Sequence, residues 1–329
     1  MSTASESGSA DRATTPDLAY GQTWPNLDVF GVLARDRRVI PVVRRLMGDA
    51  ETPVGVYRKL AGDRPGTFLL ESAEHGGVWS RWSIVGAASR ATLTERDGAA
   101  HWIGEPPVGV PTSGLATDAL AETMRVLATE PIAGLPPLTG GMVGAITYDA
   151  VRRWERVPAT APDELDLPEL ALMLATDLAV LDHADGSILL VANAINYDGT
   201  DERVEQAWAD AVARLDDMTR ALAAPAPSTV AVVDTASVDA AMATVTSNTT
   251  RERYEEVVEL AKEDIRAGEV FQVVISQRFS LDCAADPLDV YRLLRRSGPS
   301  PYLYLLRLPG LAVVGSSPEA LVTVQNGRA

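Results

Sequence analysis

Two short polar patterns have residue types that could bind a ligand. In the first, Glu71 and Ser72 close an apolar run that begins at Thr67, so a carboxylate and a hydroxyl stand at a predicted strand end. These acceptors could hold the ammonium group of a ligand. The same residues also fit an ordinary strand end, and the pattern alone leaves both interpretations open.

The second pattern lies on a predicted strand over residues 270–279. Apolar Phe271, Val273 and Ile275 alternate with polar Gln272 and Ser276, so the two kinds of side chain fall on opposite faces. A polar face of this kind is either solvated or lines a cavity for a polar ligand. The Gln272 amide takes up no proton near neutral pH, so it can contact a ligand but cannot act as a general base.

Other common types of catalytic site find no support. His75, His101 and His183 are far apart, and the one cysteine, Cys283, has no obvious base beside it. The glycine-rich stretch 140–144 matches no phosphate-binding loop, and glycine inside a strand favours close backbone packing. We therefore predict no metal site in this chain.

Composition narrows the partners and the compartment. The net charge is −16 and the sequence pI about 4.6, which disfavours binding to nucleic acid or to anionic membrane surfaces. Apolar runs stop short of the roughly 20 residues that span a bilayer. Residues 1–19 lack the basic start and apolar centre of a signal peptide, and we predict a disordered tail there. A single cysteine fits a reducing, cytoplasmic environment.

The elements that must position these residues follow from periodicity and turn signals. Strands alternate with helices in no regular strand–helix–strand order, so we predict an α+β fold with large antiparallel sheets flanked by helices. Hairpin turns are expected at residues 97–98, 185–186, 309–310 and 326–327. The predicted helices cover 53–60, 117–129, 201–223, about 250–267 and 286–296. The predicted strands cover 67–70, 79–85, 91–94, 100–103, 140–148, 170–182, 187–194, 270–279, 302–308, 311–315 and 321–325.

A change of texture near residue 224 predicts two domains. Residues 20–223 form the first, and residues 224–247, rich in Pro and small residues at their start, form a linker. Residues 248–329 begin the second, where Thr249 and Glu252 make a capping box for a helix that Gly268 closes.

Six segments in order resemble the large subunit of anthranilate synthase, a branch of the chorismate-utilising enzyme family. Each segment is weak alone, but six in the same order are specific, and the resemblance runs from about residue 25 to the last residue. The segments are residues 68–72, 80–86, 140–149, 268–279, 299–302 and 316–319.

The resemblance implies a reaction and partners. In this family, chorismate and ammonia give anthranilate and pyruvate, the first step of tryptophan biosynthesis, with Mg²⁺ holding the substrate carboxylate. The ammonia comes from a glutamine amidotransferase subunit, so a hetero-oligomer is implied. Tryptophan inhibits allosterically by binding the large subunit, and the lyase is cytoplasmic.

The resemblance also assigns site residues. The family's tryptophan-binding site corresponds here to Glu71, Ser72, Pro301, Tyr302 and Leu303. The two segments would supply acceptors for the ammonium group, backbone groups and an apolar wall.

Further positions carry over less fully. Arg81 or Ser83 would add to the tryptophan pocket. Gln272 stands where relatives that add water to chorismate carry a Lys general base, so glutamine argues for ammonia as nucleophile and places Gln272 on the active-site wall. Gly298 departs from the family, which usually has Asn there.

In the family, the catalytic His and the magnesium-binding glutamates follow the segment 316–319, so we expect a C-terminally truncated fold that is inactive alone.

Two alternatives to this function stay open. The aminodeoxychorismate synthase large subunit of folate synthesis shares most of these motifs. The chain could also be a non-catalytic tryptophan-binding fragment.

Overall fold

The computed structural model describes residues 18–73, 80–196, 200, 202–226, 230, 238, 242–324 and 327–329. The chain divides into two compact units, one made of residues 1–226 with 287–329 and the other of residues 227–286. The predictions for the tail up to residue 17, for His75, for the start of strand 79–85 and for Asn326 lie outside the described residues.

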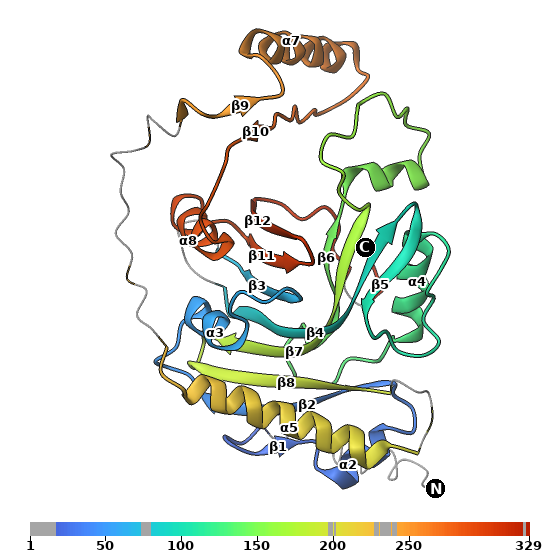
Figure 1. Cartoon of the computed structure of the whole chain (residues 1–329), viewed down its shortest axis with the longest axis vertical. Helices are drawn as coiled ribbons and strands as arrows, with labels where there is room; N and C mark the ends of the chain where they lie inside the picture. Colours follow the sequence, from blue (N-terminus) through green and yellow to red (C-terminus); the bar gives the residue numbers. More distant parts are fainter. Residues whose placement is uncertain are drawn as a thin grey trace, which may run out of the picture. The chain divides into compact units, whose positions relative to one another are not determined.

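The first unit is built on one antiparallel sheet, which in the described part of the chain has ten strands (Figure 1). Eight of them follow the order β1-β2-β8-β7-β4-β3-β11-β12, while β5 pairs with β4 and β6 with β7. The predicted α+β fold with a large antiparallel sheet is confirmed. The strands are β1 (Thr23–Trp24), β2 (Val39–Met47), β3 (Thr67–Glu71), β4 (Trp82–Arg96), β5 (Ala99–Gly104), β6 (Gly141–Ile146), β7 (Leu170–Asp182), β8 (Ser187–Ile195), β11 (Tyr302–Leu308) and β12 (Leu311–Ser317).

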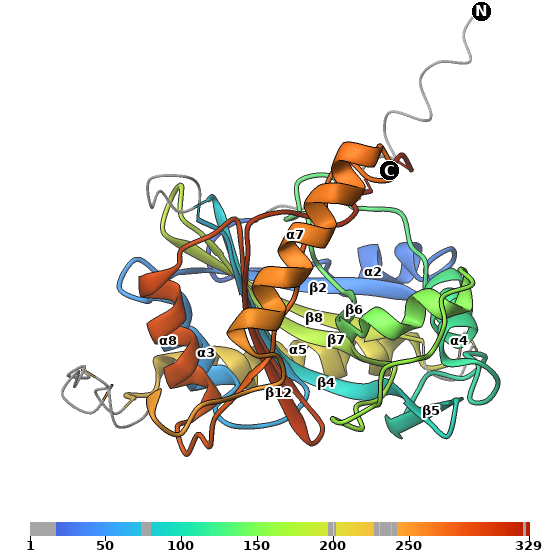
Figure 2. The same cartoon turned by 90° about the horizontal axis from the view of Figure 1, so that it is seen from above.

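Helices cover this sheet through their apolar faces. Both views show α5 lying along β8 and β2 (Figures 1 and 2). Of the other helices, α3 contacts β4 and α5, α4 contacts β5, and α8 contacts β12 and β11. On α5 the buried side chains Ala211, Leu215, Met218 and Leu222 recur at helical spacing. The helices of this unit are α2 (Leu27–Leu33), α3 (Pro53–Leu60), α4 (Ala116–Val126), the 3₁₀ helix η1 (Tyr148–Arg153), α5 (Val204–Ala223) and α8 (Pro287–Ser297).

Local signals account for most of these elements. The Thr52 hydroxyl accepts a hydrogen bond from the Gly55 amide at 3.1 Å and caps α3, as predicted. The β7–β8 and β11–β12 hairpins are also confirmed. Gly144 lets β6 approach β7, since a Cβ there would lie 1.9 Å from the Ala171 carbonyl oxygen. The glycine-rich stretch thus serves backbone packing.

Two features of the first unit differ from prediction. The strands predicted at 79–85 and 91–94 are one strand, β4, which bends through register shifts between Gly86 and Thr92 against β7. The sequence pattern also gave no prediction of α2 and β2. Pro41 inside β2 disfavours a strand, yet it is tolerated because β1 pairs only with Val43 and Arg44, which leaves Pro41 on an edge.

The compact units follow other boundaries than the predicted domains. The sequence pattern groups residues 248–329 together, whereas residues 287–329 belong to the same unit as residues 1–226. The reason is that β11 pairs antiparallel with β3, which joins residues 303–307 to residues 67–71. The assignment of a regulatory domain (20–223) and a chorismate-binding domain (248–329) stays a prediction.

The described residues of the second unit include the helix α7 (Arg251–Ala267) and a short strand pair, β9 (Thr246–Ser247) with β10 (Phe279–Ser280). The cap of α7 is Thr250, whose hydroxyl accepts from the Arg253 amide at 3.2 Å, so the predicted capping residue Thr249 is one position early. Gly268 ends the helix in the left-handed conformation, as predicted.

The predicted strand over 270–279 is wrong except at its last residue. Residues 270–278 pair with no strand in the described part of the chain, and Phe271 is fully exposed. The alternating pattern is present, but a strand needs a neighbour for its backbone groups, and β9 reaches only Phe279 and Ser280. The described residues of the predicted strand 321–325, residues 321–324, also form no strand.

Candidate functional site

The structure brings together the two sequence segments predicted to bind tryptophan. Glu71, the last residue of β3, pairs with Leu303 of β11 across the antiparallel ladder. Just past the strand end, the Ala73 amide donates to the Ser300 carbonyl oxygen at 2.9 Å. Segments separated by about 230 residues in the sequence therefore form one strand-end junction, which we define as residues 71–73 with 300–303.

The Glu71 carboxylate is buried and already has partners. Its side chain is 0% exposed. The Tyr291 hydroxyl donates to one carboxylate oxygen at 2.6 Å, and the Arg295 guanidinium contacts both oxygens, at 2.8 and 3.1 Å. Both partners come from α8, where they lie four residues apart and hence on one face. A ligand's ammonium group must displace Arg295 or Tyr291 to reach this carboxylate.

Tyr291 acts in this cluster as a hydrogen-bond donor. Burial and the adjacent negative charge of Glu71 raise the pKa of the Tyr291 hydroxyl well above its usual value. The phenol therefore stays protonated and donates a hydrogen bond to the carboxylate. Sequence reasoning missed Tyr291 and Arg295, although a Tyr and an Arg at i and i+4 on an amphipathic helix were a usable signal.

The other junction residues differ in exposure. Leu303 is buried, whereas Tyr302 is 42% exposed. The Ser300 hydroxyl donates to the Tyr302 carbonyl oxygen at 3.2 Å, which fixes the start of β11. Ser72 is half-buried, and its carbonyl oxygen accepts from the Ser80 amide at 2.9 Å. The junction thus offers a hydroxyl, an aromatic ring and a buried carboxylate from neighbouring positions.

The lesser candidates Arg81 and Ser83 have partners at the start of β4. Arg81 binds the Asp182 carboxylate, at 2.7 Å in the closest contact, and its guanidinium lies 4.3 Å from the centre of the Trp82 ring. The Ser83 hydroxyl and the His183 Nε2 atom share a hydrogen bond of 2.8 Å. The Arg81 hydrogen bond lowers the pKa of Asp182 below its usual value, so this pair stays charged at neutral pH.

Gln272 belongs to the second unit, whereas the junction residues belong to the first. It is exposed, in the extended segment 270–278. That segment is held near its end, where the Gln277 side chain donates to the Ser247 hydroxyl at 2.8 Å and the Arg278 amide to Asn248 at 2.9 Å. The assignment of Gln272 to an active-site wall stays a prediction.

Neither a metal centre nor a membrane span occurs in the residues that the structure describes. These residues contain no group of three or more His, Cys, Asp or Glu side chains that could hold a metal ion. Their helices are also too short or too polar to cross a bilayer.

Comparison with known proteins decides the family. Residues 67–329, most of the chain, match the family model for chorismate binding enzymes. The chain belongs to the chorismate binding enzyme family. The resemblance carried by the six sequence segments is thereby confirmed.

Two curated relatives of this chorismate binding enzyme carry the same name. This chain is 55% identical over 306 residues to a protein of Mycolicibacterium smegmatis and 52% identical over 305 residues to one of Arthrobacter globiformis. Both are named anthranilate synthase component 1. Each match covers 91% of this chain and 57% of the relative. The chain therefore spans little more than half the length of these relatives.

A solved structure supports the fold. The crystal structure of anthranilate synthase component I from Streptococcus pneumoniae superposes with a TM-score of 0.57 at 25% identity, covering 85% of this chain and 58% of that one. The antiparallel sheet of the first unit is thus the sheet of a chorismate binding enzyme.

Proposed function

We propose that this chain is part of an anthranilate synthase large subunit, the enzyme that converts chorismate and ammonia into anthranilate and pyruvate. The observation that carries the proposal is the identity of 52–55% over nine-tenths of the chain to proteins of that name. Identity at this level favours this function over the aminodeoxychorismate synthase alternative. The product is the precursor of tryptophan, so the enzyme belongs to aromatic amino-acid biosynthesis in the cytoplasm.

The partner in this proposal is a glutamine amidotransferase subunit that supplies ammonia. The resemblance supports this, and a hetero-oligomer follows from it. Mg²⁺ is the proposed cofactor of the whole enzyme. The described residues of this chain contain no group of three or more His, Cys, Asp or Glu side chains that could hold a metal ion, and in the family the magnesium-binding glutamates follow the segment 316–319. We therefore place the metal ligands outside these residues and derive no step through the metal.

Gln272 is proposed to line the active site without accepting a proton. An amide stays neutral near pH 7, so it cannot activate water as a base, whereas ammonia needs no such activation. The test uses the full-length Mycolicibacterium smegmatis relative with Lys at the aligned position. Loss of amination or appearance of a water-addition product supports the role, while unchanged amination without that product contradicts it.

Tryptophan is proposed to bind at the strand-end junction as a feedback inhibitor. Ser72 would accept from the ligand's ammonium group, Tyr302 would contact the indole, Leu303 would offer backbone groups, and Pro301 would fix the backbone at the start of β11. The geometry supports this because β3 and β11 are hydrogen-bonded neighbours, so one small molecule can contact residues 72 and 301–303 together.

Glu71 would transmit the binding. Its carboxylate holds Tyr291 and Arg295 of α8, and α8 directly follows residue 286, the last residue of the second unit. An ammonium group that competes for Glu71 would weaken the hold on α8. Because two sites are then linked through one competing carboxylate, tryptophan affinity and the position of α8 are coupled.

Calorimetry on the chain tests this assignment. We expect L-tryptophan to bind, Ser72→Ala to weaken it at least tenfold, and Ser89→Ala, which removes a serine hydroxyl elsewhere in the first unit, to leave it unchanged. A loss of one hydrogen bond to a charged group has about this effect. Absence of tryptophan binding by the folded chain contradicts the regulatory site.

A fluorescence assay for anthranilate tests the catalytic part. With chorismate, ammonium and Mg²⁺, we expect the chain alone to form no anthranilate, because in the family the catalytic His and the magnesium-binding glutamates follow the segment 316–319. Production of anthranilate by residues 1–329 would overturn this expectation. Tryptophan binding without anthranilate formation by the chain is also what the non-catalytic alternative expects, so the full-length relative serves as the positive control.

A further inference from the structure

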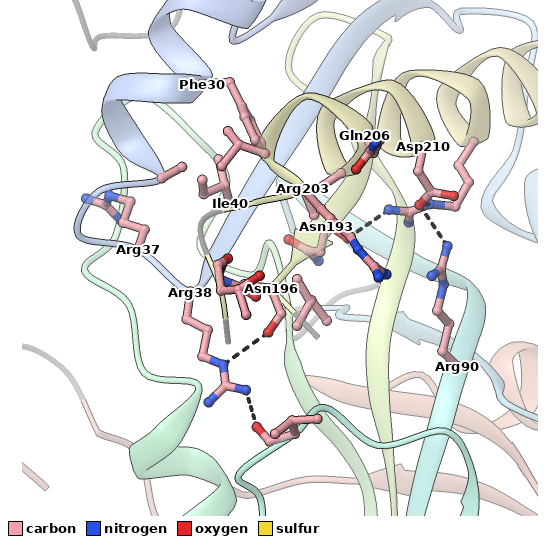
Figure 3. Close-up of a pocket in the computed structure, with 18 of the residues that line it drawn as sticks. Phe30, Arg37, Arg38, Ile40, Arg90, Asn193, Asn196, Arg203, Gln206 and Asp210 are labelled. Atoms are coloured by element: carbon pink, nitrogen blue, oxygen red, sulfur yellow. Dashed lines mark hydrogen bonds and ion pairs between the residues drawn. The ribbon is translucent and has the colours of Figure 1, made fainter. Parts of the chain in front are cut away.

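A cavity in the first unit lies outside the strand-end junction and has no role in the proposed function. Its volume is about 480 Å³, and it opens between α5, β8 and the loop that joins α2 to β2 (Figure 3). This volume is within the range of small-molecule pockets, which are largely apolar with a few placed polar groups. None of the five residues predicted for the tryptophan site lines it.

One wall of the cavity is apolar and fixed. Phe30 of α2 and Ile40 of β2 are 2% and 3% exposed, and Val204 and Ala207 of α5 line the cavity with them. These side chains are held by the main core of the unit. An apolar group of a ligand would therefore meet a preformed surface and lose little conformational entropy on binding.

The polar floor of the cavity is neutralised by its own ion pairs. Arg214 binds the buried Asp177 carboxylate, donates to the Asn193 carbonyl oxygen at 2.8 Å and to Asp210 at 3.0 Å. Arg90 donates to the same Asp210 at 2.8 Å. These arginines have carboxylate partners, so they build the floor and leave little charge for a ligand.

Arg38 differs because its hydrogen-bond acceptors are uncharged carbonyl oxygens. Its Nε donates to the Asn196 carbonyl oxygen at 3.2 Å, and its Nη2 donates to the Val108 carbonyl oxygen (Figure 3). Among the described residues, no carboxylate forms an ion pair with Arg38. The guanidinium is half-buried and has five N–H donors, so donors and a positive charge remain for an anion.

The neighbouring charges shape the preference. Arg37 donates to the Thr129 hydroxyl at 2.9 Å and to the Glu130 carbonyl oxygen, again uncharged acceptors. Arg203 also lines the cavity and has an interaction partner of its own. Among the described residues, two carboxylates line the cavity. Asp210 is bound by arginines, so of these two it is Glu105 that opposes an anion. In a chain of net charge −16, this is a local positive site.

We propose that this cavity binds a small carboxylate with an apolar body. The carboxylate pairs with the Arg38 guanidinium, whose planar N–H groups match two carboxylate oxygens. The apolar body lies against Val204 and Ala207, the half-buried part of the apolar wall. The apolar wall selects this class over inorganic anions, which would leave that wall in contact with water.

The test is calorimetry with phenylacetate and, as its neutral counterpart, phenylacetamide. We expect phenylacetate to bind at least tenfold more tightly, because only the acid can pair with Arg38. Gln206→Glu places a negative charge on an exposed lining residue of α5 and should weaken phenylacetate about tenfold. Glu105→Gln removes the opposing carboxylate and should strengthen it a few-fold.

Four further measurements establish whether phenylacetate binds in this cavity and not at another place on the chain. Arg38→Gln should abolish the preference for the acid. Arg125→Gln, which removes an exposed arginine of α4 outside the cavity, should change nothing. Ser72→Ala and saturating tryptophan should also leave phenylacetate binding unchanged, which keeps this result independent of the proposed tryptophan site.

Three outcomes would overturn the proposal. The first is no phenylacetate binding up to about 10 mM, which is weaker than most small-ligand sites. The second is equal binding of acid and amide, which means that Arg38 supplies no charge. The third is binding that is insensitive to both Gln206→Glu and Glu105→Gln, which means that the anion binds elsewhere.

Discussion

The strand-end junction and the segment 270–278 contain similar sequence patterns but different structures. Both have alternating or continuous apolar residues next to polar ones, and both patterns predict strands. Next to the junction, Leu305 of β11 is 0% exposed and pairs with β3 on one side and with β12 on the other, whereas Phe271 is 104% exposed. The difference lies in neighbours, because a strand satisfies its backbone groups only when another strand lies beside it.

This comparison explains what a polar residue means in each place. Glu71 follows a buried strand, so its carboxylate must find donors inside the protein, and α8 supplies Tyr291 and Arg295. Gln272 is exposed, so water satisfies its amide and no internal partner is required. Glu71 therefore has a role in holding the fold together, whereas the fold places no requirement on the Gln272 side chain.

The largest expected effect on stability comes from the buried apolar residue of this comparison, Leu305. Leu305→Ala removes a fully buried side chain and should lower the free energy of unfolding by about 3 kcal/mol. All six tryptophans lie outside residues 227–286, so urea unfolding followed by tryptophan fluorescence reports on the first unit.

The matched change in the segment is Phe271→Ala. Its side chain is exposed, so the change should shift stability by less than about 0.5 kcal/mol. Hydrogen exchange of the α7 amides, read by mass spectrometry, follows the same unit. A loss above about 1.5 kcal/mol for Phe271→Ala would mean that the segment is packed in solution, against the structure described above.

The second prediction compares the polar residues. Glu71→Gln removes the charge that pairs with Arg295 but keeps an oxygen acceptor for Tyr291, so we expect a loss of about 2 kcal/mol in urea unfolding. This is below the usual cost of breaking a fully buried pair, since the Arg295 side chain is 29% exposed. Gln272→Ala should lie within about 0.5 kcal/mol of the unmodified chain. Equal effects at the two positions would remove the contrast between them.

The sequence was sufficient for elements whose signals are local. The Thr52 cap of α3, the Gly268 end of α7 and the β7–β8 and β11–β12 hairpins all depend on residues within a few positions of each other. Each could be predicted because turn and cap chemistry acts over a short stretch of chain.

Features that depend on distant neighbours could not be predicted in this way. Whether residues 270–278 form a strand depends on a partner strand. Whether the Glu71 carboxylate has hydrogen-bond partners depends on α8, some 220 residues later. The cavity beside Arg38 needs α2 and β2, neither of which had a clear local signal. The family resemblance supplied the pairing of the two junction segments, since it placed residues 71–72 and 301–303 in one site.

The smallest expected effect is a pH dependence next to the junction. The Arg81 hydrogen bond lowers the pKa of Asp182 in the folded chain. Because the folded pKa lies below the unfolded value of about 3.9, the stabilising contribution is complete above that value and is lost as pH falls through the folded pKa. We expect the stability difference between the unmodified chain and Asp182→Asn to be constant from pH 7 to about 5 and to shrink below about pH 4.

The matched pair in the second unit is Glu259 with Lys262, where the lysine hydrogen bond lowers the pKa of Glu259 in the same direction. The Glu259 and Lys262 side chains are both exposed, at 66% and 51%. In the other pair Arg81 is exposed, at 59%, but Asp182 is only 9% exposed. Salt at about 0.5 M should therefore remove the pH-dependent contribution of Glu259, because screening acts on solvent-exposed pairs, and should leave most of that of Asp182. Urea titrations of Asp182→Asn and Glu259→Gln at pH 3 to 7, with and without salt, measure both. If salt removed the two contributions equally, the Asp182 pair would be no better shielded than a surface pair, and burial would no longer distinguish the edge of the junction from α7.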